Sequence, residues 1–205
     1  MVEATGTRGS QTSPETGPET KTQYQPFILV VAGAPLHGKT TLATEMAARS
    51  NLVRLDVDEA RAKLFPNAAG KMLSEEQERD IMLASYEAVH EQAQSIVGQG
   101  KPVVIAAAYT RSTYHEMLRD VVKKAGVPLK FILLECTEEE ALARLTRRNG
   151  QGSLSNVTNP DQYRAIRARY EIMSQAILVN STHLETSVQA TRKLVGAHEI
   201  KPIVD

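Results

Sequence analysis

Short apolar runs recur along the chain, and longer stretches that mix apolar and polar positions separate them. In the first run, residues 27–32, every position is apolar. This is typical of a strand buried on both faces of a parallel sheet. Further runs follow at residues 52–55, where Arg54 interrupts the apolar positions, and at 103–108 and 131–134, with a weaker one at Ile177–Asn180. The pattern therefore predicts a parallel sheet of about five strands.

The segments between these runs carry the start and stop signals of helices. Ser74 and Gln77 are spaced as a capping box, and a second box begins at Thr137. Pro160 suits the first position of a helix, and Gly126 suits the position after its end. These signals predict helices over residues 39–49, 58–65, 74–98, 113–125 and about 185–195, and from positions 137 and 160. Strands that alternate with helices predict a three-layer α/β/α fold.

The first 25 residues differ in composition from the rest of the chain. They are rich in Thr, Ser, Gly, Pro and Glu and hold almost no large aliphatic side chains. Such a segment cannot bury enough apolar surface to offset the entropy lost on ordering. We therefore predict a disordered tail over residues 1–25 and one folded domain over residues 26–205.

Charge and targeting signals narrow the function classes. The 24 Lys and Arg residues balance 24 Asp and Glu residues, so the basic excess of a general nucleic-acid-binding protein is absent, although a local basic patch is compatible with this balance. No apolar run reaches the roughly 18 residues that span a membrane, and no signal peptide is evident. The single cysteine, Cys136, is interpreted as a small apolar residue at a strand end. We expect a cytoplasmic protein with no membrane contact.

Residues 33–40 read Gly-Ala-Pro-Leu-His-Gly-Lys-Thr and match G-x-x-x-x-G-K-[ST] at every fixed position. Glycines let successive backbone N–H groups point at phosphates; the lysine reaches the β- and γ-phosphates and the threonine binds Mg²⁺. The guanine signature Asn-Lys-x-Asp is absent, so ATP with Mg²⁺ is the expected ligand. The predicted nucleotide contacts are Gly33, Ala34, Pro35, Leu36, His37, Gly38, Lys39, Thr40 and Thr41.

Two aspartates follow the second predicted strand. Ligands of open α/β sheets bind at the carboxyl ends of strands, and alternation along a strand would place Asp56 and Asp58 on one side. An alternative interpretation of Asp58 is a helix N-cap. The Asp-x-Asp pattern resembles that of P-loop kinases of the shikimate and gluconate kinase type. The Asp58-x-x-Arg61 pattern resembles that of polynucleotide kinases. The resemblance implies that Asp58 is the general base, Arg61 a substrate clamp and Asp56 a metal-shell residue.

Arg144 and Arg148 lie four residues apart on one face of the helix predicted after the fourth strand. A loop over residues 149–159, with Gly150 and Gly152, follows them and is suited to motion. The arrangement resembles the Arg-Leu-x-x-Arg lid of adenylate-kinase-like enzymes, which implies that these arginines stabilise the transferring phosphoryl group. The alternative is a solvated basic helix end.

One position departs from these kinases. They carry an aspartate near the end of the third strand, where this chain has Ala106. Either Asp56 supplies the carboxylate near Mg²⁺, or the protein binds nucleotide and transfers phosphate poorly. Beyond this strand, Arg111 is a candidate substrate contact because an anionic acceptor group needs a cation. Tyr109 and His115 could face the same acceptor pocket.

Together these features resemble a P-loop kinase that transfers the γ-phosphoryl group of ATP to a hydroxyl of a small molecule. The alternatives are a polynucleotide-end kinase, a nucleotide-sugar kinase similar to zeta toxins, and a nucleotide-binding regulator with little turnover. The predicted roles are catalysis for Lys39, Asp58, Arg144 and Arg148, substrate binding for Asp58, Arg61 and Arg111, and metal binding for Thr40 and Asp56.

Overall fold

The computed structural model describes residues 25–68, 71–148, 157–168, 170–171 and 176–196. The predicted N-terminal tail, apart from residue 25, and most of the predicted lid loop lie outside these residues. The described part contains a five-stranded parallel sheet with the strand order β2-β3-β1-β4-β5. The strands are β1 (Ile28–Gly33), β2 (Val53–Asp56), β3 (Val103–Ala106), β4 (Leu129–Glu135) and β5 (Ile177–Asn180).

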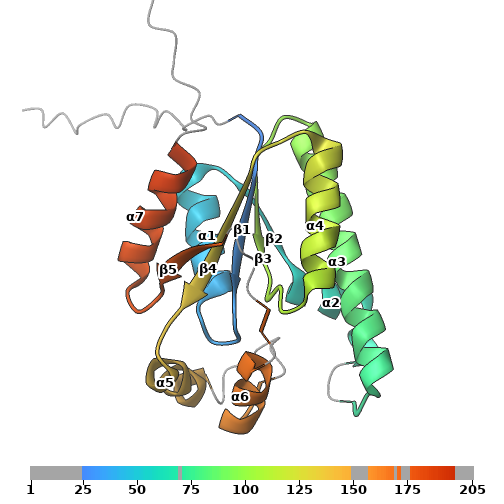
Figure 1. The fold of residues 1–205 in the computed structure, drawn as a ribbon, viewed down its shortest axis with the longest axis vertical. Coiled ribbons are helices and arrows are strands. Elements are labelled where there is room, and N and C mark those ends of the chain that lie inside the picture. Colours follow the sequence, from blue (N-terminus) through green and yellow to red (C-terminus); the bar gives the residue numbers. More distant parts are fainter. Residues whose placement is uncertain (1–24, 69–70, 149–156, 169, 172–175, 197–205) are drawn as a thin grey trace, which may run out of the picture.

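Helices cover both faces of the sheet, which confirms the predicted α/β/α fold (Figure 1). One face carries α1 (Lys39–Ser50) and α7 (Leu184–Val195), and the other carries α2 (Val57–Leu64), α3 (Glu75–Gly98) and α4 (Ser112–Ala125). The short η1 (Pro66–Ala68) follows α2. The helices α5 (Glu138–Arg148) and α6 (Pro160–Ala168) lie beyond the edge at which β1 and β4 end. None of the helices in the described part is long and apolar enough to cross a membrane.

The central strand β1 contributes to both apolar cores, which explains its unbroken apolar sequence. Val30 packs in the core formed with α3 and α4, whereas its neighbour Val31 packs in the core formed with α1 and α7. Both side chains are fully buried. Because successive side chains of a strand point to opposite faces, a strand between two helical layers needs an apolar residue at every position.

The junction between β2 and α2 differs from the prediction in a way that affects the site. β2 ends at Asp56 and α2 begins at Val57, so Asp58 lies in the first helical turn. The N-cap is Asp56, whose Oδ1 accepts hydrogen bonds from the backbone N–H groups of Asp58 (2.9 Å) and Glu59 (3.4 Å). The N-cap interpretation of Asp58 is therefore wrong. The strand-alternation argument also fails, because the backbone turns into a helix between the two aspartates.

Candidate nucleotide-binding and phosphoryl-transfer site

The phosphate loop, residues 33–40, connects β1 to α1 and depends on its two glycines. Gly33 has φ +150°, and a Cβ atom there would lie 2.8 Å from the backbone oxygen of Leu134 on β4. Gly38 has φ +84° and is the N-cap of α1. Both positions have conformations that L side chains rarely adopt. The backbone therefore explains why a loop of this shape requires glycine at these two places.

The Lys39 side chain folds back over its own loop. Its Nζ donates a hydrogen bond to the backbone oxygen of Ala34 at 3.1 Å. Burial lowers the pKa of Lys39, while the carboxylates of Asp58 and Asp56 raise it in opposition. The ammonium group thus binds its own loop and lies within electrostatic reach of two carboxylates.

The Thr40 hydroxyl donates a hydrogen bond to Oδ2 of Asp56 at 2.9 Å. Asp56 on β2 lies beside Ala106 on β3 in the parallel register. A carboxylate on the strand next to Ala106 therefore contacts the phosphate loop. Asp56 is also held by Arg54, with Nη1 and Oδ2 3.5 Å apart.

Asp58 lies in the first turn of α2 and within electrostatic reach of the loop. Burial raises the pKa of the Asp58 carboxyl, while the cations Lys39, Arg61 and Arg148 oppose the rise. The Arg61 guanidinium lies 3.6 Å from Oδ1 of Asp58. The Asp58 carboxyl therefore lies among cations at the start of α2, beside the phosphate loop.

The two predicted lid arginines occupy different environments. Arg144 donates from Nη1 to the Leu36 backbone oxygen (3.0 Å) and from Nη2 to the Ser181 backbone oxygen (2.6 Å), and its Nε bonds to Glu140 (2.9 Å). Arg148 donates to the backbone oxygen of Val157 and interacts electrostatically with Asp58. Arg144 therefore holds the phosphate loop by a hydrogen bond, whereas Arg148 binds the Val157 backbone and influences Asp58 and Lys39 through its charge.

The residues that follow β3 separate into two groups. Arg111 is exposed at the N-cap of α4. Tyr109 and His115, in contrast, are buried, and Nε2 of His115 lies 2.9 Å from the backbone oxygen of Tyr109. Burial lowers the pKa of His115. The structure thus places Tyr109 and His115 in the core behind the site and leaves Arg111 at the surface.

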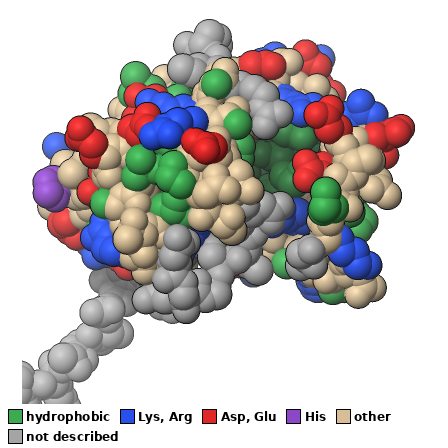
Figure 2. Space-filling view, turned by 90° about the horizontal axis from the view of Figure 1, so that it is seen from below, with side chains coloured by type: hydrophobic (Ala, Val, Ile, Leu, Met, Phe, Trp, Pro, Cys, Tyr) green, Lys and Arg blue, Asp and Glu red, His purple; other side chains and the backbone are tan. Residues whose placement is uncertain are grey.

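The face of the molecule formed by the ends of β1 and β4 is hollowed (Figure 2). Hydrophobic side chains form the floor of the hollow, and acidic and basic side chains lie around its rim. Helices α5 and α6 are on this side of the sheet (Figure 1). They dock on the phosphate loop through an apolar cluster that includes Ala34, Cys136 and Tyr163. Cys136 is buried, which raises the pKa of its thiol, in agreement with its interpretation as a packing residue.

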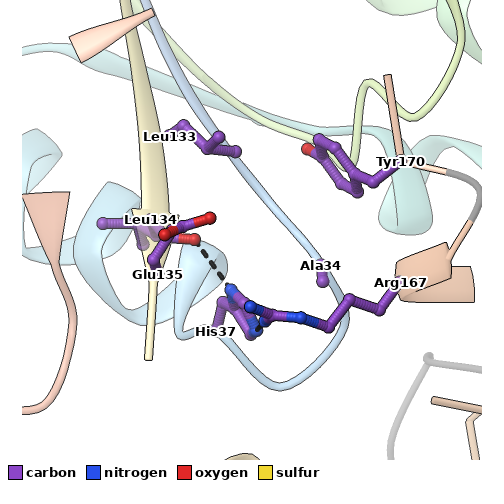
Figure 3. A pocket seen from close by; sticks show the side chains of 7 residues that line it. All are labelled: Ala34, His37, Leu133, Leu134, Glu135, Arg167 and Tyr170. Atoms are coloured by element: carbon purple, nitrogen blue, oxygen red, sulfur yellow. Dashed lines mark hydrogen bonds between the residues drawn. The ribbon is translucent and has the colours of Figure 1, made fainter. Parts of the chain in front are cut away.

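A pocket of about 150 Å³ lies beside the phosphate loop (Figure 3). Arg167 of α6 extends across it next to His37. The sequence alone does not predict Arg167 as a site residue, because α6 is separated from the motif by more than 100 residues and its arginines follow no known spacing. The sequence offered one indication that Arg167 belongs to the site, which is its position shortly after the predicted lid. The lining residues are Ala34, His37, Leu133, Leu134, Glu135, Arg167 and Tyr170.

The described residues contain no cluster of three or more His, Cys, Asp or Glu side chains that could hold a metal ion by themselves. Magnesium in phosphate sites commonly uses one or two carboxylates, with waters and phosphate oxygens completing its shell. The Thr40 hydroxyl and the Asp56 carboxylate, 2.9 Å apart, fit that mode of binding. The donor set is therefore suited to a cation that arrives with a nucleotide.

A parallel sheet with the loop between its central strand and α1, and with glycines in these conformations, defines a P-loop nucleotide-binding protein. A family model described as an AAA domain matches residues 28–173, which is more than half of the chain. The chain belongs to this family of P-loop proteins. No curated protein matches the sequence.

Solved structures share the fold. A proposed kinase from Chloroflexus aurantiacus superposes with a TM-score of 0.68 at 19% identity, covering 85% of this chain and 98% of that one. A gluconokinase from Sinorhizobium meliloti gives 0.63 at 17% identity, with 85% and 97% covered. The APS kinase of Mycobacterium tuberculosis, in complex with AMPPNP and APS, gives 0.59 at 14% identity, with 84% and 99% covered. The fold is therefore that of P-loop kinases.

Proposed function

We propose that this protein transfers the γ-phosphoryl group of ATP to a hydroxyl group of a small molecule. The observation that carries the proposal is the contact between Thr40 and Asp56, with Oγ1 and Oδ2 2.9 Å apart. This contact joins the phosphate loop to the carboxylate of Asp56 at the end of β2. Asp58 follows two residues later in the chain. Phosphoryl transfer needs these groups together, since it depends on positioning and on neutralising phosphate charge.

In this proposal the phosphate loop holds ATP through its backbone N–H groups and through Lys39. The lysine would exchange the Ala34 oxygen, now 3.1 Å away, for phosphate oxygens. Thr40 and Asp56 would hold Mg²⁺, which supplies charge neutralisation on the phosphates. Pro35 and Leu36 contribute loop backbone, and Thr41 lies in the first turn of α1, where its N–H group points toward the same end of the helix.

Asp58 would accept the proton of the acceptor hydroxyl. Its raised pKa supports this role because a stronger base accepts a proton more readily, provided that the carboxyl is ionised. Arg148, which interacts with Asp58, would stabilise the transferring group. Arg144 would act mainly by holding Leu36 of the loop in place. Arg61 and Arg111 would contact the acceptor from α2 and α4.

A screen of hydroxyl compounds tests the proposal. Purified protein, Mg²⁺ and ATP would be incubated with separate acceptors, including gluconate, APS and simple sugars, and products would be read by mass spectrometry. We expect one acceptor class to gain one phosphoryl group while ADP forms in equal amount. Asp58→Asn should lose this activity, and Glu59→Gln is the matched control, because Glu59 is the next residue and pairs with Arg54. ATP binding without transfer to any acceptor would favour the alternative of a nucleotide-binding regulator.

A further inference from the structure

His37 connects the phosphate loop to two other parts of the molecule. Its Nδ1 lies 2.7 Å from the backbone oxygen of Leu134, at the end of β4. Its Nε2 lies 3.1 Å from the hydroxyl of Tyr163 and 3.3 Å from Nη1 of Arg167, both on α6. The His37 and Tyr163 side chains are buried. The loop is thus bonded to the sheet on one side and to α6 on the other.

The partners of His37 determine its tautomer. A backbone oxygen can only accept, so Nδ1 carries the hydrogen and Nε2 is left as an acceptor. Nε2 can then receive the hydroxyl hydrogen of Tyr163 or an Nη1 hydrogen of Arg167. The pKa of His37 is lowered to about 4, mainly by burial and also by the charges of Lys39 and Arg167, while the hydrogen bond to Leu134 opposes the change. The ring is therefore neutral near pH 7 and keeps the acceptor that these partners need.

Tyr163 completes the connection between His37 and Arg167. The Nη1 group of Arg167 donates to the Tyr163 hydroxyl at 3.2 Å as well as lying 3.3 Å from His37. One end of the guanidinium is therefore fixed by two buried side chains. A guanidinium has five N–H donors on three nitrogens, so Nε and Nη2 can still donate to a ligand.

The fixed guanidinium lines the pocket beside Ala34, the second residue of the phosphate loop. Glu135 lies across the pocket from it, with Tyr170 at another side (Figure 3). A ligand in this pocket would present an anionic group to Arg167 and a hydroxyl or another donor to Glu135. Arginine binds carboxylates and phosphates through paired N–H groups, which suits it to this task.

We propose that Arg167 binds an oxyanion group beside the phosphate loop and that His37 and Tyr163 are the residues that position it. The inference rests on the proposed function, because the site is useful only next to a bound nucleotide. Two sources share the required chemistry. They are the terminal phosphate of ATP and an anionic group, carboxylate or phosphate, on the acceptor.

The test uses calorimetric titration of the full chain with three probes in the presence of Mg²⁺. The probes are ADP, AMPPNP, and inorganic phosphate added to the AMPPNP-saturated protein, in which the terminal-phosphate position is already filled. Arg167→Ala is compared with Arg164→Ala, a matched control on the same helix. Arg164 pairs with Glu138 (2.8 Å) and Asp161 (3.3 Å) on its exposed side. Thermal unfolding of each variant shows whether it folds as the wild type does.

We expect Arg167→Ala to bind ADP as the wild type does. It should lose about tenfold in affinity for AMPPNP if the terminal phosphate is the ligand, or for inorganic phosphate if the acceptor is the source. Arg164→Ala should bind all three probes normally. Tyr163→Phe should lower the same affinity that Arg167→Ala lowers, by a smaller factor, with ADP binding unchanged. A residue with only a packing role would not separate ADP from the other probes.

Equal binding of AMPPNP and of inorganic phosphate by Arg167→Ala and the wild type would overturn the oxyanion site. If Arg167→Ala weakened one of them and Tyr163→Phe weakened neither, the positioning role would be overturned. Failure of the wild-type protein to bind ADP would contradict the proposed function itself, together with the inference that rests on it.

Discussion

The hydroxyl of Thr40 and the carboxylate of Asp56 are joined by a hydrogen bond of 2.9 Å, which links the phosphate loop to the end of β2. The two oxygens of Asp56 have separate roles. Oδ2 accepts from Thr40, whereas Oδ1 caps α2 by accepting from the backbone N–H of Asp58 at 2.9 Å. One side chain therefore supports both the fold and the expected metal site, and suitable substitutions can separate the two.

Asp56→Asn should keep the cap and lose the charge. Asparagine is as good an N-cap as aspartate, so the free energy of unfolding should change little. The affinity for Mg²⁺-ATP should fall at least tenfold, because an amide oxygen is a poorer partner for Mg²⁺ than a carboxylate. Asp56→Ala should show the same loss and, in addition, a destabilisation of about 1 kcal/mol from the missing cap. Denaturant unfolding measures the change in stability, and titration with ATP in the presence and absence of Mg²⁺ measures the change in affinity. Normal Mg²⁺-ATP affinity in Asp56→Asn would show that Asp56 does not belong to the metal site.

Asp58→Asn should lower kcat by about 100-fold or more while nucleotide affinity stays the same, since the loss of a general base affects the transfer step. Burial raises the pKa of Asp58, so its ionised form is less stable in the folded protein than in the unfolded chain. Above this pKa, the neutral asparagine should therefore raise the melting temperature. Its Tm at pH 7 and the kcat of both proteins are the measurements.

The same raised pKa predicts the pH dependence of the proposed phosphoryl transfer by the wild-type protein. Transfer requires the ionised carboxylate, so kcat/KM should fall with decreasing pH through a midpoint above 3.8, the ordinary value for aspartate. A pH–rate profile with the acceptor found by the screen measures this midpoint. An acidic limb that stays in place after Asp58→Glu would assign the titration to another group.

Gly33→Ala should prevent nucleotide binding and destabilise the fold. The added Cβ atom would lie 2.8 Å from the Leu134 oxygen, and the backbone has φ +150°. Gly126→Ala is the control, because Gly126 has φ +65° with nothing within 4 Å of its Cβ position. It should cost only the strain of a left-handed alanine, about 1 kcal/mol, and leave ATP binding normal. Urea unfolding should therefore show a larger loss of unfolding free energy for Gly33→Ala than for Gly126→Ala. Equal losses would mean that β4 shifts to accommodate the added Cβ atom.

His90 should make stability depend on pH. It is buried on α3 with Nε2 2.8 Å from the Tyr109 hydroxyl, and burial lowers its pKa from 6.5 to about 4. Between these values the unfolded chain binds a proton that the folded protein does not, so the free energy of unfolding falls as the pH falls from 6.5 to 4. At about 1.36 kcal/mol per pH unit, the loss approaches about 3 kcal/mol. His90→Gln should make the pH dependence less steep without abolishing it, because the pKa of His37 is also lowered to about 4 and its contribution remains. An unchanged slope from urea unfolding at several pH values would exclude His90 as a cause.

The sequence could predict the elements of the fold because their signals are local. The capping box at Ser74 and Gln77 forms as expected, with both of its hydrogen bonds present. The unbroken apolar sequence of β1 also has the expected cause, since its side chains alternate between two cores. The ends of elements were less predictable. β3 stops at Ala106 rather than at 108, and Tyr109 soon after it adopts φ +50°.

The sequence could also predict the phosphate loop, because a motif of eight adjacent residues holds its own geometry. Thr40 and Lys39 were identified by their spacing alone. What remained open was whether Asp56 could substitute for the aspartate missing at Ala106. The parallel register of β2 and β3 places these two positions side by side, and Asp56 contacts Thr40; that Asp56 takes over the role of the missing aspartate stays a prediction.

Only the tertiary structure decided which side chains from distant segments share the site. His37 is 97 residues from Leu134 and 126 residues from Tyr163, and it contacts both. Arg144 and Arg148 look equivalent in sequence, yet one donates to the phosphate loop at Leu36 and the other to the backbone of Val157. Periodicity, caps and glycine spacing act over a few residues, and so the chain itself specifies them. Contacts across the sheet depend on the order β2-β3-β1-β4-β5, which results from the packing of the whole chain.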